Sequence, residues 1–583
     1  MQLFNKKQFG LIRFFLIFCS VLFTTTPLYA LQQSSNNPPG YAVASANPLA
    51  TNAGLEMLAK GGNAFDAAVA VAAVLSVVEP YHTGLGGGSF WLLHQEPGHK
   101  NIFLDARETA PLAAKKDMFL AADGSIIPGL SLNGGLAAAI PGHPAALVYV
   151  AKNYGRLPLK TTLAPAIKIA QEGFVVDKQL SRLMKRSDRL EQLKKYPATA
   201  AIFLNKGRAY EIGERLIQTD LAKTLTVIAE QGKKGFYAGD VAQQLVKGVN
   251  AAGGKWSLAD LAQYQVTLRE PLIGAYHNML VITAPPPSAG GVALLTMLNI
   301  LSQYSLDSFT KVQWVHYMVE AMRLAYWQRD EFLGDPDFLS VPVEKLVSAD
   351  NAKQLSTLIS PTKAISSNVL QGPINKPAKL SNTTHMSIID AEGNRVAATM
   401  TINYIFGASV VAEGTGVLLN DEMDDFSAKV GEKNVFGIVG TDKNAIAPGK
   451  RPISSMTPTF LELPDRVAIL GTPGGSRIPT MVLIASLIFN DSYGAISMVS
   501  AMRFHHQYLP DVVQFEPDTF SPELQESLKA MGYQLMPLEQ YYGDMQAITW
   551  DKKTNILTAA SDPRGIGLAA SMVTALGGYG VKY

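Results

Sequence analysis

A threonine at the start of a predicted hairpin has the clearest chemical potential in this sequence. Residues 383–390 and 395–403 are rich in residue types that favour strands, and the Ala-Glu-Gly-Asn sequence between them favours a turn. Glu392 is the midpoint of this pattern, and Thr383 and Thr401 are equally far from it. Simple pairing therefore predicts that the two hydroxyls face each other across neighbouring strands, as a nucleophile and its hydrogen-bond partner would.

A threonine hydroxyl is a weak nucleophile that needs a base, and the α-amino group of an N-terminal threonine can be that base. Thr383 would acquire such an amine only if the chain were cut between Asn382 and Thr383. The alternative is a polar loop that leads into an ordinary strand, and the local sequence alone favours it because such patterns are common. Residues 360–380 are polar and interrupted by prolines, which predicts a linker leading to Thr383.

Charged residues elsewhere in the chain could contact a ligand. Arg107 follows a predicted buried strand at 102–105, where ligand contacts are frequent, although a solvated surface arginine would give the same pattern. An acidic cluster occupies 421–427. It lacks the alternating spacing of an EF-hand calcium loop, so a solvated turn is its simplest interpretation.

Two short polar motifs follow the acidic cluster. Ser454 and Ser455 are adjacent, and Gly474 and Gly475 follow a proline. Both motifs are typical of turns. A pair of glycines can also present its backbone N–H groups to an anion or to an oxyanion.

Predicted helices and loops supply the framework around these residues. Two helices are expected at 47–60 and 64–78, and the second is apolar on most sides and therefore buried. Most of 140–260 has helical periodicity, and a further helix is predicted at 312–327. Residues 428–450 are rich in Gly, Lys and Asn, which predicts a long exposed loop.

Residues 1–30 have the pattern of a secretion signal that is removed after Ala30. A positively charged start precedes an apolar segment at 14–23 that is too short to span a bilayer. One alternative is a lipoprotein signal at Cys19, which the bulky Phe18 before it disfavours, and another is an anchor that is never removed. The segment has three positive and no acidic residues, so its removal changes the net charge from +2 to −1.

The composition of the mature chain excludes several classes of function. A nearly neutral chain gives no electrostatic reason to expect nucleic acid or an anionic membrane as partner. The only cysteine lies in the signal segment, so the mature protein has no disulfide, thiol nucleophile or cysteine-based metal site. The histidines include no His-Glu-x-x-His or similar spacing. We therefore predict no metal site and no cofactor.

Taken together, the motifs resemble those of the γ-glutamyltransferase (γ-glutamyl transpeptidase) family, within the N-terminal-nucleophile hydrolases. The resemblance runs from about residue 40 to the end, and the ordered set is highly specific although each motif alone is weak. The matching motifs are Asn-Ala-x-Asp-Ala-Ala-Val-Ala at 63–70, Leu-Gly-Gly-Gly at 85–88, Asp-x-Arg-Glu at 105–108, Thr-Thr-His-x-Ser at 383–387, Met-Asp-Asp-Phe-Ser at 423–427, Arg-Pro-x-Ser-Ser-Met at 451–456 and Pro-Gly-Gly-Ser-Arg at 473–477.

The resemblance implies an α/β fold, a four-layer α-β-β-α sandwich formed as one domain by two chains after self-cleavage. Thr383 Oγ would attack the carbonyl of Asn382, and water would hydrolyse the resulting ester. The products would be a large subunit, 31–382, and a small subunit, 383–583, which remain together as a heterodimer. The small subunit would begin with the nucleophile and its own amine as base.

The resemblance also assigns roles at the substrate pocket. The α-carboxylate of a γ-glutamyl group would bind Arg107, Ser454 and Ser455. Its α-ammonium would bind Asn403, Glu422 and Asp425, although some bacterial relatives have Gln at the position of Glu422. The backbone N–H groups of Gly474 and Gly475 would hold the oxyanion, and Thr401 would hydrogen-bond Thr383.

The loop at 428–450 would correspond to a lid, with Phe436 at a position where certain relatives have Tyr. The implied activity is that of a periplasmic or secreted γ-glutamyltransferase. It would transfer the γ-glutamyl group of glutathione and related compounds to water, amino acids or peptides without a cofactor. One alternative is an acylase specific for glutaryl or cephalosporin-type substrates, which the acidic Asp425 disfavours. Another is a secreted binding protein that has lost catalysis.

Overall fold

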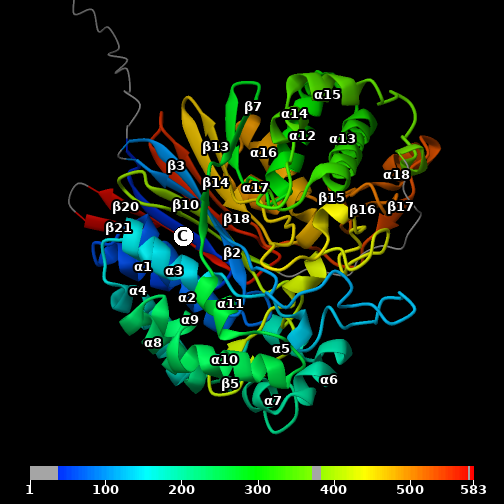
Figure 1. Ribbon diagram of the computed structural model, residues 1–583. Coiled ribbons are helices and arrows are strands. Elements are labelled where there is room, and N and C mark those ends of the chain that lie inside the picture. The colour runs from blue at the N-terminus through cyan, green and yellow to red at the C-terminus, as the bar shows by residue number, and fades with distance from the viewer. Residues whose placement is uncertain (1–36, 97, 371–382, 576–577, 583) are drawn as a thin grey trace, which may run out of the picture. The chain divides into compact units, whose positions relative to one another are not determined.

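Two antiparallel β-sheets pack against each other between two layers of helices (Figure 1). The first sheet has the strand order β21-β20-β1-β9-β10-β2-β3-β6, and the second has the order β19-β18-β14-β13-β8-β7. The predicted signal segment, 1–30, and Asn382 lie outside the described residues. The computed structural model describes residues 37–96, 98–370, 383–575 and 578–582.

The strands of the first sheet are β1 (Gly40–Ser45), β2 (Gly88–Gln95), β3 (Lys100–Ala106), β6 (Thr267–Arg269), β9 (Thr384–Ile389), β10 (Arg395–Thr401), β20 (Leu568–Ala575) and β21 (Gly578–Lys582). Those of the second sheet are β7 (Leu272–Tyr276), β8 (Met279–Thr283), β13 (Thr459–Leu463), β14 (Arg466–Gly471), β18 (Gln546–Asp551) and β19 (Ile556–Ser561). Smaller sheets contain β4 (Phe174–Val175), β5 (Arg215–Leu216), β11 (Val411–Ala412), β12 (Val417–Leu418), β15 (Phe504–His505), β16 (Val513–Phe515) and β17 (Leu535–Pro537).

The predicted hairpin is confirmed as β9 and β10, at the centre of the first sheet. Thr384 pairs with Met400, so the next position of the same register brings Thr383 opposite Thr401. The turn is tied together by Asp390, whose Oδ1 accepts from the N–H groups of Glu392 and Asn394, each at 3.0 Å. A turn that closes on its own side chain fixes the register of both strands.

Alternation along the strands divides the interior into two cores. On β2, Trp91 and Leu93 face the first helical layer, whereas Phe90 and Leu92 face the second sheet. All four side chains are fully buried. A strand buried on both faces reads as a continuous apolar run, which is what the sequence has here.

The first helical layer covers the outer face of the first sheet. Its second helix, 64–78, begins with a capping box in which Asn63 accepts from the N–H of Asp66 while Asp66 accepts from the N–H of Asn63. All of its residues are buried, as the apolar composition predicted. The helices of this layer are α1 (Pro48–Ala59), α2 (Ala64–Val78), α3 (His143–Tyr154), α4 (Leu159–Glu172), α5 (Lys178–Met184), α6 (Ser187–Lys195), α7 (Pro197–Phe203), α8 (Thr219–Gln231), α9 (Lys234–Tyr237), α10 (Gly239–Ala251) and α11 (Leu258–Gln263).

The second helical layer covers the outer face of the second sheet and completes the four-layer α-β-β-α sandwich. Among the described helices, none combines the length and the apolar character needed to cross a membrane. The helices are α12 (Gly290–Leu301), α13 (Lys311–Phe332), α14 (Val343–Leu346), α15 (Ala349–Ser356), α16 (Ile478–Asn490), α17 (Ala495–Ser500) and α18 (Pro522–Ala530). Short 3₁₀ turns are η1 (Gly135–Ala137), η2 (Leu306–Ser308), η3 (Ser367–Leu370), η4 (Glu422–Asp425), η5 (Asp442–Asn444) and η6 (Gly475–Arg477).

The prediction that 428–450 is an exposed loop is wrong in part. The segment does lack long helices and strands, but Phe436 is only 5% exposed. The side chain of Gln507 donates to the carbonyl of Phe436 at 3.3 Å, and the N–H of Val435 donates to Asp424 at 2.9 Å. The polar composition of 428–450 therefore predicted a loop correctly, but this loop packs onto the protein and does not extend into solvent.

Candidate active site

One pocket, at one end of the two sheets, contains most of the residues singled out in the sequence. The cavity has a volume of about 30 Å³. Asn382 lies outside the described residues, and Gly474 directly precedes a lining residue. The predicted residues that line the pocket are Arg107, Thr383, Thr401, Asn403, Glu422, Asp425, Ser454, Ser455 and Gly475.

The register of the first sheet explains why residues so far apart in sequence meet here. Thr401 at the end of β10 pairs with Gly88 at the start of β2, and Ser89 pairs with Ala106 at the end of β3. Arg107 follows directly, so it lies at the same edge of the sheet as Thr401. A side chain at Gly88 would begin 2.3 Å from Oε2 of Glu108, so only glycine lets β2 pass this carboxyl group.

Thr383 and Thr401 are each only 4% exposed. The N–H of Asn403 donates to Oγ1 of Thr401 at 2.8 Å, which fixes the position of that hydroxyl. Asn403 adopts a φ of 73°, a left-handed conformation that asparagine tolerates better than most residues. The chain therefore reverses immediately after β10 and returns a polar side chain to the pocket.

Arg107 is the central cation of the pocket and is 1% exposed. Its guanidinium donates to Glu422, and Nη2 lies 2.5 Å from Oδ2 of Asp425. It also donates to the carbonyls of Pro452 at 3.2 Å and Ile453 at 3.1 Å. The solvated-arginine interpretation is therefore wrong, because a buried guanidinium needs these partners to offset its desolvation.

Three buried carboxyl groups surround this cation. Oε2 of Glu108 lies 3.5 Å from Nη1 of Arg107. Burial raises the pKa of Glu108 to about 7, the pKa of Glu422 well above its usual range, and the pKa of Asp425, although the charge of Arg107 opposes each shift. Arg329, which lines the same pocket, also lowers the pKa of Asp425, but two cations still face three carboxyl groups in a site of low polarity. The raised pKa values favour a proton that the carboxyl groups of this cluster share.

The two serines occupy the side of the pocket contributed by the second sheet's connections. Ser454 is anchored through its backbone, because its N–H donates to the carbonyl of Pro287 at 2.9 Å. Its hydroxyl accepts from the N–H of Met456 at 3.2 Å. Ser455 is more exposed than Ser454. Both serines line the same pocket as Arg107, and the combination of hydroxyl donors with a cation suits a carboxylate.

The paired glycines form a strained turn at the start of η6. Gly474 has a φ of 147° and Gly475 has a φ of 53°, and the ideal side-chain position of Gly474 lies 2.5 Å from Cε of Met481. The hydroxyl of Tyr326 donates to the carbonyl of Ser476, which holds the turn from the second helical layer. A turn with two adjacent glycines can present successive backbone N–H groups to an anion.

His385 belongs to the same motif as Thr383 but lies outside the pocket, between the two sheets. Nδ1 lies 2.8 Å from the hydroxyl of Thr399, and the ring fills the space beside Gly471 of β14. Burial lowers the pKa of His385 to about 3. A buried, neutral histidine that packs against Gly471 and does not line the pocket is a packing residue here, not a general base.

Comparison with known proteins identifies the family. The model of the gamma-glutamyltranspeptidase family matches residues 50–572. The chain belongs to this family. It is 43% identical over 515 residues to a glutathione hydrolase proenzyme of Pseudomonas sp. (strain A14), with 87% of this chain and 88% of the relative covered. It is 40% identical over 530 residues to the glutathione hydrolase proenzyme of Escherichia coli (strain K12), with 90% of both covered.

Solved structures agree with this assignment to the gamma-glutamyltranspeptidase family. A cephalosporin acylase from Bacillus halodurans superimposes with a TM-score of 0.81 at 28% identity, over 94% of this chain and 98% of that one. A Helicobacter pylori gamma-glutamyltranspeptidase chain matches with a TM-score of 0.54 at 39% identity, over 56% of this chain and 93% of that one. The protein is thus an enzyme of the gamma-glutamyltranspeptidase family with an N-terminal-nucleophile hydrolase fold.

Reasoning from the sequence missed three residues of this family site. Glu108 adjoins Arg107 within the quoted Asp-x-Arg-Glu motif, so its position was a usable signal. Arg329 and Asn434 line the pocket itself, whereas Glu108 lies beside it, 3.5 Å from Arg107. Arg329 lies within the long helix α13, and Asn434 lies in a polar loop, so neither stands out from its neighbours in the sequence.

Proposed function

We infer that the substrate is a γ-glutamyl amide such as glutathione, and that the enzyme transfers the γ-glutamyl group to water, amino acids or peptides. The observation that carries this proposal is the pocket itself, where the hydroxyl-bearing Thr383 lies with Arg107 and Asp425. A γ-glutamyl group has a reactive amide at one end and an α-amino acid at the other. The hydroxyl of Thr383 matches the amide end, and the charges of Arg107 and Asp425 match the α-amino acid end.

The proposal requires self-cleavage between Asn382 and Thr383. Thr383 Oγ attacks the carbonyl carbon of Asn382, the peptide nitrogen leaves as the new amine of Thr383, and water hydrolyses the ester to a carboxylate at Asn382. The products are the subunits 31–382 and 383–583. The strand order supports a stable heterodimer, because β9 and β10 of the small subunit lie between β1 and β2 of the large one. Likewise, β13 pairs with β8 across the proposed boundary.

In the catalytic cycle, the α-amine of Thr383 removes the proton of its own hydroxyl, which attacks the γ-carbonyl of the substrate. We assign the oxyanion to the backbone N–H groups of Gly474 and Gly475, and a hydrogen bond to the nucleophile to Thr401. The leaving amine takes the proton, and a γ-glutamyl ester of Thr383 remains. Water or an acceptor amine then attacks this ester and releases the enzyme.

Recognition of the α-amino acid end follows from the charge cluster. Arg107 donates to the carboxyl groups of both Glu422 and Asp425. A bound zwitterion can separate them, with its carboxylate on Arg107, Ser454 and Ser455. Its ammonium then takes Asn403, Glu422 and Asp425 as acceptors. The net charge of the site is unchanged by this exchange, so substrate entry leaves no buried charge without a partner.

The glutaryl-specific acylase remains the second candidate, because a cephalosporin acylase is a structural neighbour at 28% identity. A glutaryl group has no ammonium. Asp425 would then face a substrate that offers it no partner, and burying such a carboxylate is costly. We therefore favour the γ-glutamyl substrate over both the glutaryl substrate and a protein without catalysis. We also propose export to the periplasm or beyond, on the basis of the signal pattern at 1–30.

The test combines processing with substrate choice. Purified wild type should give two chains, the smaller beginning at Thr383, and Thr383→Ala should stay whole and lack turnover. Thr383→Ser should retain cleavage at a reduced rate, which separates loss of the hydroxyl from loss of fold. The wild type should hydrolyse a γ-glutamyl anilide faster than the matching glutaryl anilide. An uncut, folded wild type, or a preference for glutaryl, would overturn the proposal.

A further inference from the structure

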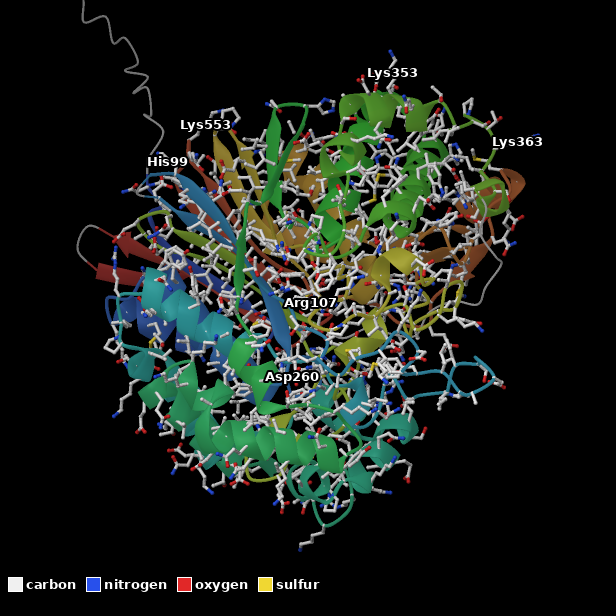
Figure 2. All side chains as sticks on the ribbon, in the orientation of Figure 1. His99, Arg107, Asp260, Lys353, Lys363 and Lys553 are labelled. Carbon is white, nitrogen blue, oxygen red and sulfur yellow. The ribbon has the colours of Figure 1, made fainter. Side chains whose placement is uncertain are left out.

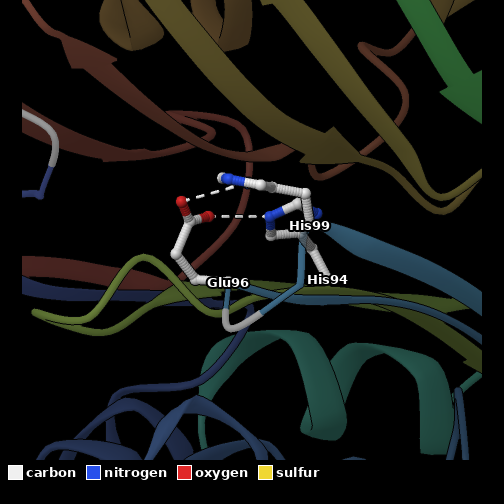
Figure 3. Close-up of side chains that lie close together, drawn as sticks. All are labelled: His94, Glu96 and His99. Atoms are coloured by element: carbon white, nitrogen blue, oxygen red, sulfur yellow. Dashed lines mark hydrogen bonds and ion pairs between the residues drawn. The ribbon is translucent and has the colours of Figure 1, made fainter.

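A cluster of three potential metal ligands lies on the hairpin formed by β2 and β3. His94 is near the end of β2, Glu96 and His99 are in the connection, and the N–H of His99 donates to the carbonyl of Glu96 at 3.1 Å. Nε2 of His94 lies 2.8 Å from Oε2 of Glu96, and Nδ1 of His99 lies 3.3 Å from Oε1 of the same carboxylate. Figure 3 shows the carboxylate facing both imidazoles, with a dashed line to each.

We propose that His94, Glu96 and His99 bind a divalent transition-metal ion, with Zn²⁺ as the best fit. Two imidazoles and one carboxylate are ligands that zinc accepts, and water would supply a fourth. One ligand atom from each residue lies within 4.8 Å of the others. Ligand atoms around one tetrahedral zinc ion lie roughly 3.3 Å apart, so small side-chain rotations bring all three into place. Mg²⁺ and Ca²⁺ fit poorly, because they prefer sites made of oxygen atoms.

His94 already has the kind of hydrogen-bond partner that orients a metal-bound histidine. Oδ1 of Asn101, its partner across the β2–β3 pair, lies 2.7 Å from Nδ1 and therefore accepts the Nδ1–H proton. On the other side of the ring, Nε2 faces Oε2 of Glu96 at 2.8 Å, and a metal ion would take the place of the proton between these two atoms. An imidazole that donates one N–H to an oxygen and offers the other nitrogen is the usual arrangement of a metal-bound histidine.

A gradient of exposure leads from the interior to solvent along the cluster. The side chains of His94, Glu96 and His99 are 4%, 26% and 79% exposed. The buried ligand is thus held rigidly, and the exposed ligand leaves a path by which an ion can enter. The neighbouring cation Arg395 is paired with Glu462 at 2.7 Å, which moderates its repulsion of a metal ion.

The cluster is separate from the catalytic pocket. The pocket adjoins Gly88 at the start of β2, whereas His94 lies toward the opposite end of that strand. Figure 2 shows His99 at the edge of the molecule and Arg107 near its centre. A metal ion here would have a structural role. It would fasten the β2–β3 hairpin beside the β9–β10 turn, where the N–H of Glu96 donates to Asn394 at 3.1 Å.

The sequence predicted no metal site because the motifs sought place two histidines on one face of a helix. Here the ligand spacing is His-x-Glu-x-x-His, and a hairpin turn brings the side chains together. This spacing predicts a metal site only when the register of the two strands is known, because the register decides which side chains meet.

The test measures zinc binding by titration calorimetry with ZnCl₂. The sample is the whole enzyme after export, with both subunits and without an affinity tag. Wild type should bind one ion per chain and unfold at a higher temperature with zinc. His99→Ala and Glu96→Gln should weaken binding by more than the roughly 10- to 100-fold expected for Asn101→Ala, which only supports His94. His277→Ala is the matched control, since His277 is exposed and outside the cluster, and it should bind as wild type does.

Cobalt gives a second readout. Co²⁺ in the wild type should show the visible absorption of a tetrahedral site, and His99→Ala should lose it. Turnover of a γ-glutamyl anilide should be the same in wild type and His99→Ala, so this test is independent of the proposed function. No saturable binding in the wild type, or equal binding in wild type, His99→Ala and Glu96→Gln, would overturn the proposal.

Discussion

Nη2 of Arg107 lies 2.5 Å from Oδ2 of Asp425, and both side chains line the pocket that contains Thr383. The pair joins the end of β3 to η4, segments more than three hundred residues apart. Its geometry resembles what a bound amino acid would present to each partner, a carboxylate to the arginine and a cation to the aspartate. In the binding mode that we propose, the carboxylate and the ammonium of the substrate would take the place of this internal pair.

Asp425→Asn should lower kcat/KM for γ-glutamyl substrates by at least about 30-fold. The change removes the charge that we assign to the substrate ammonium, and loss of a partner from a buried charge pair costs about 2 to 5 kcal/mol. Turnover of a glutaryl substrate should fall much less, because that substrate has no ammonium. The ratio of the two kcat/KM values, measured on processed enzyme, is the decisive quantity.

Glu422→Gln is the matched control for this experiment. If Glu422 carries the proton of the cluster, a neutral amide replaces a neutral carboxyl group, and kcat/KM should stay within about tenfold of wild type. A loss as large as that of Asp425→Asn would show that Glu422 acts as an anion. The proton would then have to be reassigned to Glu108.

Much of this site was predictable because its residues occur in motifs whose local structure is strongly determined. The β9–β10 hairpin placed Thr383 opposite Thr401 by counting from Glu392 alone, and the register confirms that pairing. Hairpin partners are local in sequence, so turn chemistry and strand periodicity suffice to align them.

Contacts between distant segments could not be predicted in this way. Arg107 looked equally like a surface residue, and its burial depends on η4 and on the carbonyls of Pro452 and Ile453. Phe436 lies in a polar loop and is buried by contacts with segments distant in the sequence, such as that of Gln507. The metal cluster at His94 likewise depends on a turn whose side-chain directions the sequence does not specify.

Thr401→Val should lower both self-cleavage and turnover by roughly 5- to 150-fold. Valine has the same shape but lacks the hydroxyl that we propose hydrogen-bonds to the nucleophile. A hydrogen bond to a charged group, or to a group that becomes charged in the reaction, is worth about 1 to 3 kcal/mol. It also removes the acceptor for the N–H of Asn403. Thr401→Ser keeps the hydroxyl and should process and turn over at nearly the wild-type rate. Equal defects in the two variants would exclude the hydroxyl as the cause.

Gly471→Ala should reduce the free energy of unfolding by about 1 to 3 kcal/mol through overpacking. The ideal position of its methyl group lies 2.3 Å from Cε1 of His385, a ring held between two sheets that cannot withdraw. Gly494→Ala is the control, because the nearest atom to its methyl group is 3.7 Å away. Chemical denaturation of both variants gives the comparison. A stable Gly471→Ala variant would mean that the sheets can separate at this point.

His385, two residues after Thr383, should make the stability of the protein sensitive to acid. Burial lowers the pKa of His385 from the ordinary 6.5 to about 3, so below pH 6.5 the unfolded chain takes up a proton that the folded chain does not. Stability should therefore fall with pH through this window and level off near pH 3. One such group costs about 2 kcal/mol between about pH 7.5 and about pH 5.

His385→Gln isolates this contribution. Other buried histidines, among them His143 and His506, shift in the same direction, so the wild type should lose more than one histidine's share. The variant should show a shallower decline in the free energy of unfolding with falling pH, whatever its stability at neutral pH. His277→Gln, at an exposed position, should decline as steeply as wild type. If His385→Gln has the wild-type slope, His385 must be protonated in the folded protein, and its assignment as a neutral packing residue is wrong.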